Sequence, residues 1–218
     1  MSIEAKAPKM DSLLYTDELT KIYNRRYMKE VIPGHLVRAE EEGFSVVLYM
    51  IDMDKFKNIN DTFGHGVGDS ALQLFSEILY EESKEKGDAI RYAGDEFVLV
   101  LSELDKKEAR QLGLNIQKRL AETPLKAKGE EIILGCSMGI SLFPKDGKTV
   151  KVLFEKADEA LYVAKDRGRG TVVVFPDSGK LLVPSKLDSI LDSPYVVGRD
   201  EILQFMDIHL SNKGKSSA

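Results

Sequence analysis

Two pairs of carboxylates stand where a carboxylate is costly to desolvate, and their spacing suits a bound cation. Asp52 and Asp54 follow the apolar run FSVVLYMI, while Asp95 and Glu96 occupy a bend between the apolar runs AIRYA and FVLVL. A carboxylate beside a buried sheet needs a cation or hydrogen-bond donors to offset its desolvation. Along a strand, Asp52 and Asp54 would share a face while Met53 points away from them. If the bend pairs beside this strand, Asp95 meets Asp52, and such oxygen ligands suit Mg²⁺ or Mn²⁺.

The same acids also have a structural interpretation. Carboxylates at strand ends can cap helices, and these could instead pair with Arg91 and Lys57. Spacing alone leaves both interpretations open, because short motifs without structural context often match by chance. The glycine-rich stretch GHGVG at residues 64–68 lacks the Lys-Ser/Thr ending of a phosphate-binding loop, so we interpret it as a turn.

Apolar periodicity predicts the elements that position these acids. A long helix is expected at 16–43, with Thr16 as its N-cap and an interruption at Pro33 and Gly34. The remaining expected helices lie at 68–86, 106–122 and 149–168. The expected strands are a fully buried one at 44–51, a hairpin turning at 93–95, a half-buried one at 131–143 and a last one at 171–175. This alternation predicts an α/β fold, with a mixed sheet covered by helices.

Composition and charge limit the classes of partner and compartment. The 218 residues carry a formal net charge of −5, which argues against a nucleic-acid or anionic-membrane partner. No signal-like N-terminal region and no apolar stretch near the roughly 20 residues of a membrane span are present, so we expect a cytoplasmic protein without membrane insertion. The single cysteine, Cys136, excludes an intrachain disulfide and is expected to be a buried thiol.

Three regions are expected along the chain. Residues 1–13 read as a polar lead-in, 14–176 as one domain, and 177–218 as a linker and extension with a short helix around Glu201 to Leu210. The lead-in has no room for a sensor domain, so we expect any control to come from sequence missing from this chain or from C-terminal sequence, such as a C-terminal regulatory module.

Four segments together resemble the GGDEF-domain family of diguanylate cyclases. They are DELTKIYNRRYM at 17–28, DMDKFKNINDTFGHGVGD at 52–69, RYAGDEF at 91–97 and ADEALYVAKDRGRG at 157–170. Each segment alone is modest evidence, whereas all four in family order are highly specific. The resemblance implies a fold like that of nucleotidyl-cyclase cores and polymerase palms. It also implies a reaction that condenses two GTP into cyclic di-GMP and two pyrophosphates.

The resemblance assigns roles to the acids. Asp52 would bind two metal ions, Mg²⁺ or Mn²⁺, and the Met53 carbonyl would bind one of them. Asp95 would be the second metal carboxylate, and Glu96 would bind metal or deprotonate the attacking ribose 3′-hydroxyl. The catalytic set that the resemblance implies is therefore Asp52, Asp95 and Glu96.

The resemblance also assigns a substrate site. The implied guanine readers are Asn60 and Asp69, with His65 as a loop contact near the base. The implied triphosphate contacts are Lys165 and Arg169, four apart on a predicted helix, and the backbone amides of Lys55, Phe56 and Lys57. Gly94 is a further implied substrate-binding residue. A carboxylate at Asp69 can accept from the ring N–H and the amine of guanine together, so we expect GTP rather than ATP. Without the segments that resemble the family, Lys165 and Arg169 would be interpreted as basic residues in a solvated last helical turn, where the helix dipole favours them.

Departures from the family leave an alternative open. Ala93 replaces the first glycine of the signature, and the Arg-x-x-Asp product-inhibition motif is replaced by Lys84 and Gly87. Two subunits must face each other for turnover, so a homodimer is expected. The alternative is a degenerate domain that binds GTP and regulates an attached module. Asp17 and Arg91 are expected to pair and to hold the leading segment against the sheet.

Overall fold

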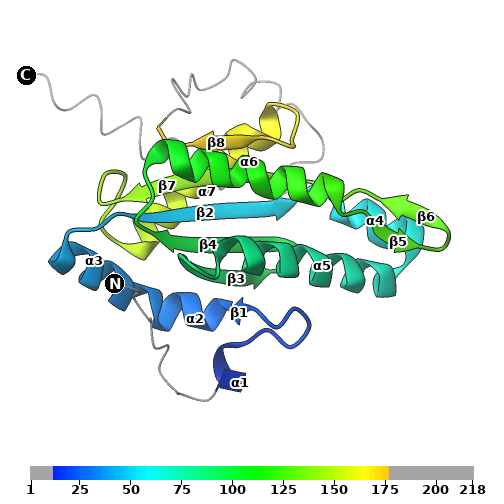
Figure 1. Cartoon of the computed structure of the whole chain (residues 1–218), viewed down its shortest axis with the longest axis horizontal. Helices are drawn as coiled ribbons and strands as arrows, with labels where there is room; N and C mark the ends of the chain where they lie inside the picture. Colours follow the sequence, from blue (N-terminus) through cyan, green and yellow to red (C-terminus); the bar gives the residue numbers. More distant parts are fainter. Residues whose placement is uncertain (1–11, 177–218) are drawn as a thin grey trace, which may run out of the picture. The chain divides into compact units, whose positions relative to one another are not determined.

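A computed structural model describes residues 12–176, which are built around a six-stranded mixed sheet (Figure 1). The strand order is β1-β3-β4-β2-β7-β8. The strands are β1 (Tyr23–Asn24), β2 (Val46–Met53), β3 (Gly87–Ala93), β4 (Glu96–Ser102), β7 (Cys136–Phe143) and β8 (Val172–Val174), and β5 (Leu125–Ala127) and β6 (Glu130–Ile132) form a separate hairpin. The pairs β1–β3 and β7–β8 are parallel, and the other pairs of the sheet are antiparallel.

Helices cover both faces of this sheet, which confirms the predicted fold class. They are α1 (Ser12–Tyr15), α2 (Arg25–Glu30), α3 (Ile32–Glu42), α4 (Phe56–Phe63), α5 (His65–Ser83), α6 (Lys106–Glu122) and α7 (Val150–Asp166). Figure 1 shows α5 and α6 in front of the sheet and α7 behind it. Within residues 12–176, no helix combines the length and the apolar character needed to cross a bilayer.

Strand β2 lies at the centre of the sheet and contributes side chains to two hydrophobic cores. Its side chains alternate because successive residues of a strand point to opposite faces. Tyr49 and Ile51 pack with residues of α5 and α6 on one face, and Leu48 and Met50 pack with residues of α2, α3 and α7 on the other. The expected continuous burial of this strand is confirmed, and Asp52 near its end is only half-buried.

Strand β7 is buried along its whole length, so the prediction of a half-buried strand was wrong. The residues that alternate with its apolar side chains are small, and α7 packs directly on them. A Cβ on Gly139 would lie 1.9 Å from the carbonyl oxygen of Ala157, and Ser141 donates to the carbonyl of Leu153 at 2.7 Å. Small residues therefore mark a close helix contact here rather than a solvent face. Cys136 is buried as expected.

The leading segment is not one helix, and Thr16 does not cap a helix as predicted. Thr16 forms an isolated bridge with Tyr23, and the chain turns between them because the Asp17 carboxylate accepts from the N–H and the hydroxyl of Thr20. The helix cap is Asn24, whose side chain accepts from two N–H groups in the first turn of α2. The predicted interruption is confirmed, because α3 begins just before Pro33.

The polar stretch after β2 is helical rather than a loop. It forms α4 and the first turn of α5, which meet at Gly64 with φ 88°. A residue with a side chain is disfavoured at such φ, so Gly64 marks the break. The expected turn at 64–68 is therefore a helix junction. Helices α6 and α7, the 93–95 hairpin and β8 are confirmed, whereas the helix expected at 201–210 lies outside the described residues.

Candidate active site

The antiparallel pairing of β2 with β4 brings the acids of the two strand ends together. Asp52 is directly opposite Glu96 in this ladder, and the N–H of Met53 donates to the carbonyl of Asp95 at 3.1 Å. Asp95 sits on the two-residue turn between β3 and β4. The predicted meeting of Asp95 with Asp52 is thus confirmed at the level of the backbone, and Glu96 is the direct cross-strand neighbour.

These acids disfavour one another's charge. Burial raises the pKa of the Asp95 carboxyl, and the negative charge of Asp52 raises it further. Burial also raises the pKa of Glu96, with added contributions from Asp52 and Asp95. In both cases the Lys165 ammonium opposes the rise. A cluster of this kind gains from a cation placed among its oxygens.

Lys165 already supplies one positive charge. Its Nζ donates to Asp52 Oδ2 at 2.7 Å, with the side chains 32 % and 16 % exposed. Within residues 12–176, no three acidic, histidine or cysteine side chains are arranged to hold a metal ion as they stand. The donor set still fits Mg²⁺, because this ion takes one or two carboxylates and completes its octahedron with waters and substrate phosphates.

Asp54 follows the structural interpretation instead. Its carboxylate accepts from Ser137 Oγ at 2.8 Å and from the N–H of Gly170 at 3.0 Å. Asp54 therefore ties the end of β2 to β7 and to the turn before β8. Sequence reasoning missed Ser137. Nothing in the small-residue pattern of β7 distinguishes a serine that donates a hydrogen bond to a carboxylate from a small residue that only packs against a helix.

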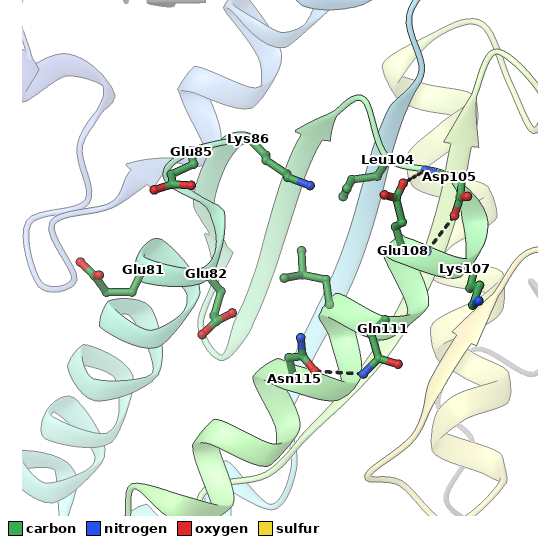
Figure 2. A pocket seen from close by; sticks show the side chains of 11 residues that line it. Glu81, Glu82, Glu85, Lys86, Leu104, Asp105, Lys107, Glu108, Gln111 and Asn115 are labelled. Carbon is green, nitrogen blue, oxygen red and sulfur yellow. Dashed lines mark hydrogen bonds between the residues drawn. The ribbon is translucent and has the colours of Figure 1, made fainter. Parts of the chain in front are cut away.

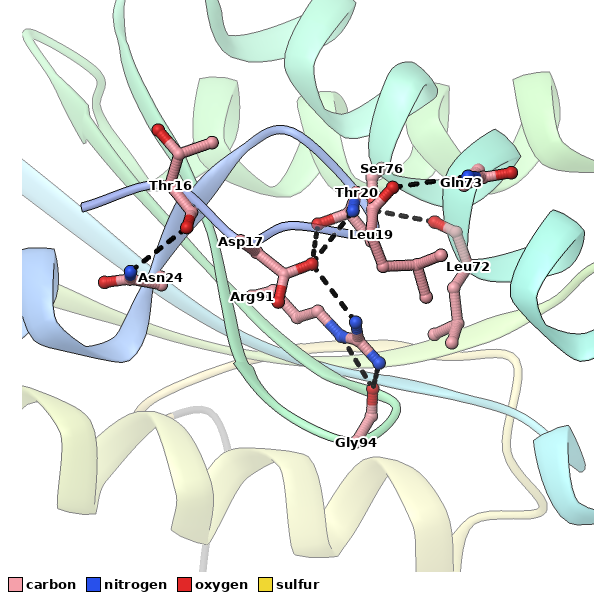
Figure 3. A network of polar contacts seen from close by, with 10 residues as sticks. All are labelled: Thr16, Asp17, Leu19, Thr20, Asn24, Leu72, Gln73, Ser76, Arg91 and Gly94. Carbon is pink, nitrogen blue, oxygen red and sulfur yellow. Dashed lines mark hydrogen bonds and ion pairs between the residues drawn. The ribbon is translucent and has the colours of Figure 1, made fainter. Parts of the chain in front are cut away.

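Arg91 holds the turn that carries Asp95 (Figure 3). Its Nε and Nη2 donate to the Gly94 carbonyl at 3.0 and 2.9 Å, and its Nη1 donates to Asp17 Oδ1 at 3.1 Å. The predicted pair of Asp17 with Arg91 is therefore confirmed. The leading segment, the guanidinium and the signature turn form one polar network, so a change in the leading segment can reach the turn through two contacts.

The residues assigned to guanine lie on α4 and α5. Asn60 is on α4, and Asp69 is exposed in the second turn of α5. The Asn60 side chain lies against Gly68, where an added Cβ would be 1.9 Å from Asn60 Oδ1. The absence of a side chain at Gly68 therefore leaves room for the Asn60 amide. His65 is exposed at the start of α5.

Gly68→Ala should weaken nucleotide binding without unfolding the domain. The clash is with the end of a flexible side chain, which can rotate away, and Asn60 would then leave the position in which it is expected to contact guanine. We expect KM for GTP to rise about tenfold with kcat changed much less, because a positioned hydrogen bond contributes about 1–2 kcal/mol. An unchanged KM in steady-state kinetics would contradict the assignment of Asn60 to guanine.

The residues assigned to phosphate come from two helix ends. Lys55 precedes α4 with φ 58° and no side chain caps this helix, so the amides of Lys55, Phe56 and Lys57 lie where helix N-termini bind anions. Lys165 is in the last turn of α7, but Arg169 lies beyond the end of this helix. The prediction that Lys165 and Arg169 share a helix face was therefore wrong. Helix α7 ends at Asp166, and Gly168 and Arg169 adopt positive φ.

Asp158 is a further acid that the sequence analysis did not single out. It lies on α7, where burial raises its pKa and Lys165 opposes that rise. Its negative charge also contributes to the raised pKa of Glu96. The signal available in the sequence was its place seven residues before Lys165, two turns along the same helix face.

Comparisons with known proteins agree with this geometry. The family described as "Diguanylate cyclase, GGDEF domain" matches residues 14–171. The chain belongs to the GGDEF domain family. Diguanylate cyclase DosC of Escherichia coli K12 is 39% identical over 163 residues, and the response regulator PleD of Caulobacter vibrioides is 36% identical over 163 residues. These matches cover 74% of this chain but 35% and 36% of the relatives, so the chain spans about a third of their length.

Solved structures show the same fold. The GGDEF domain of DgcB from Caulobacter crescentus, solved in complex with c-di-GMP, superposes with a TM-score of 0.70 at 27% identity and covers 73% of this chain and 95% of that one. A sensory box/GGDEF family protein from Caulobacter crescentus CB15 gives 0.66 at 35% identity, with 71% and 99% covered.

The region of the GGDEF product-inhibition motif is an acidic groove in this chain (Figure 2). Figure 2 shows Glu81, Glu82 and Glu85 on the α5 side of the groove and Asp105 and Glu108 on its α6 side, and Lys86 and Lys107 also line it. The groove has a volume of about 730 Å³. Lys84, at the position of the motif's arginine, pairs with Glu81 at 2.7 Å. At the position of the motif's aspartate, a Cβ on Gly87 would lie 2.0 Å from the Val100 carbonyl oxygen, so the backbone leaves no room for that side chain.

Cyclic di-GMP should therefore be a poor feedback inhibitor of this GGDEF domain. Its two phosphates would meet a lining in which acidic side chains outnumber lysines, which disfavours binding. We expect added cyclic di-GMP to lower initial turnover by less than about twofold at concentrations that saturate an intact inhibitory site. Strong noncompetitive inhibition in an initial-rate assay would overturn this prediction.

Proposed function

We propose that this GGDEF domain is a diguanylate cyclase that condenses two GTP into cyclic di-GMP and two pyrophosphates. The observation that supports the proposal most is the pairing of Asp52 with Glu96, beside the turn that carries Asp95. Helix α4 follows β2 directly, and Lys165 of α7 contacts Asp52 near the end of β2. GTP and a divalent metal are the usual substrate and cofactor of the family.

The proposed metal ligands are Asp52, the Met53 carbonyl, Asp95 and Glu96, with two Mg²⁺ or Mn²⁺ per site. When bound, such ions neutralise charge that develops on the phosphoryl oxygens and lower the pKa of a nearby hydroxyl. Glu96 would accept the proton of the ribose 3′-hydroxyl, and its raised pKa suits a proton acceptor.

The remaining residues would position the nucleotide. Asn60 and Asp69 would hold guanine, and Lys165, Arg169 and the amides of residues 55–57 would hold the triphosphate. Each 3′-hydroxyl would attack the α-phosphate of the GTP held by the other subunit. One subunit alone cannot close the ring, so turnover requires a homodimer, and catalysis is mostly positioning and charge neutralisation.

A degenerate, GTP-binding regulatory domain is the second candidate, and Ala93 is the observation that favours it. Ala93 lies at the exposed end of β3, opposite Glu96, and the positive φ of the turn falls on Gly94 at 49°. The backbone at position 93 therefore does not require glycine. We expect Ala93→Gly to change kcat/KM by less than about threefold, since alanine adds one methyl group. A gain of two orders of magnitude would show that Ala93 disables the site.

One incubation separates the candidates. The 218-residue chain is mixed with Mg²⁺ and GTP, ATP or both, and the products are resolved by chromatography. We expect cyclic di-GMP from GTP alone and no product from ATP. Binding of GTP without any product would favour the regulatory alternative, and a mixed dinucleotide would overturn the assignment of Asp69.

A further inference from the structure

Two residues with separate proposed roles are bonded to each other. Lys165 Nζ lies 2.7 Å from Asp52 Oδ2, although 113 residues separate them in the chain. Both side chains are largely shielded, so the attraction is stronger than at an open surface. In the proposed function Asp52 binds cations and Lys165 binds the triphosphate. Each role competes with the pair, because the pair occupies one oxygen of the Asp52 carboxylate and part of the Lys165 ammonium.

We propose that Lys165 is the resident counter-cation of Asp52, and that a divalent cation and a triphosphate displace this pair together. The inference deepens the proposed function and rests on it, because it takes Asp52 as a metal carboxylate and Lys165 as a phosphate contact. It adds that the two binding events are coupled through one ion pair.

The charges around the pair explain the coupling. Asp52 faces Glu96 across the ladder and has Asp95 beside it, so without the ammonium three negative charges would stand together. Asp158 on α7 also faces Lys165. A divalent cation that binds alone must displace the Lys165 ammonium from Asp52. The displaced ammonium then stays nearby and repels the cation. A triphosphate arriving alone must detach it and leave Asp52 uncompensated.

Arrival of both ligands removes each cost. The phosphate oxygens would accept hydrogen bonds from the Lys165 ammonium, and the Asp52 carboxylate would hold the divalent cation in place of that ammonium. Every charge would then keep a partner. The long lysine stem allows this exchange without a backbone movement. Each ligand therefore raises the affinity for the other by the same factor, as linkage requires.

Binding of Mn²⁺ alone tests the inference without any turnover. Free Mn²⁺ is followed by electron paramagnetic resonance as the 218-residue chain is titrated, with and without a non-hydrolysable GTP analogue. For the wild type we expect the analogue to tighten Mn²⁺ binding at least about tenfold. For Lys165→Met we expect Mn²⁺ alone to bind about tenfold more tightly than to the wild type, and the effect of the analogue to shrink.

Lys151→Met is the matched control. Lys151 lies on the same helix, is 85 % exposed and pairs with Glu155 at 3.9 Å, so its loss should leave Mn²⁺ binding at the wild-type value. Lys165→Gln serves as a second variant, and circular dichroism checks that each variant is folded.

The outcomes distinguish the inference from the function on which it rests. If the wild type binds Mn²⁺ with the analogue but neither Lys165 variant gains affinity for Mn²⁺ alone, Lys165 does not compete with the ion and the inference is wrong. If the wild type binds no Mn²⁺ even with the analogue, the proposed metal site itself is wrong. A gain in both Lys165 variants but not in Lys151→Met supports the inference.

Discussion

Asp95→Asn should lower the turnover of GTP by at least about 10³-fold while leaving the domain folded. The substitution keeps the shape of the side chain and removes the charge that the proposed metal site needs, and loss of charge stabilisation in a phosphoryl transfer commonly costs this much. Burial and Asp52 raise the pKa of Asp95, so the folded domain disfavours its ionised form. Neutral asparagine removes that penalty, and we expect an unchanged or higher melting temperature.

Asp95→Asn is expected to lower turnover without lowering the melting temperature, and this combination distinguishes a catalytic role of Asp95 from a structural one. Cyclic di-GMP production and thermal unfolding are measured on the same preparation, with Asp166→Asn as control. Asp166 is exposed at the end of α7, where an acid is unfavourable for the helix dipole, so its loss should leave turnover within about twofold. Retained activity in Asp95→Asn would remove Asp95 from the site, and a fall in both activity and stability would make its role structural.

Gly139→Ala should strongly destabilise the described fold. Its Cβ would lie 1.9 Å from the carbonyl oxygen of Ala157 and 2.2 Å from the N–H nitrogen of Leu161, and both are backbone atoms of α7. The helix would have to move off the sheet. Because overpacking of a core commonly costs 1–3 kcal/mol and backbone cannot rotate away, we expect the free energy of unfolding to fall by about 3 kcal/mol or more.

Gly66→Ala provides the matched control for the same added methyl group. Nothing lies within 4 Å of a Cβ at Gly66 in α5, so the substitution should raise stability by about 0.5–1 kcal/mol through helix propensity. Urea denaturation measures both variants. Equal stabilities for Gly139→Ala and the wild type would show that α7 does not pack on β7 as described.

The parts of the fold that could be predicted are those where local sequence decides the outcome. The continuous apolar run of β2 predicts a strand that is buried on both faces, and the bend at residues 93–95 separates two β-rich runs. In α7 the apolar residues form an unbroken row along one helix face. The leading segment was misjudged because Thr16 and Asn24 are both good caps, and only the turn closed by Asp17 selects Asn24. Propensity cannot rank two caps when a tertiary contact chooses between them.

The neighbourhood of the candidate acids was predictable, whereas their side-chain contacts were not. The family blocks place Asp52, Asp95 and Glu96 on adjoining strand ends, and the ladder confirms that neighbourhood. The bond of Lys165 to Asp52 spans 113 residues and depends on how α7 crosses the sheet, which no local pattern encodes. The same holds for Ser137, whose hydroxyl reaches Asp54 because β7 lies beside β2.

Anomalous diffraction from crystals grown with Mn²⁺ and a non-hydrolysable GTP analogue tests the central assignment most directly. We predict two manganese peaks between the triphosphate and the strand ends, with Asp52 contacting both and with the Met53 carbonyl and the Asp95 or Glu96 carboxylates completing the protein ligands. An analogue bound with no manganese at Asp52, or with Lys165 still on that carboxylate, would contradict the account.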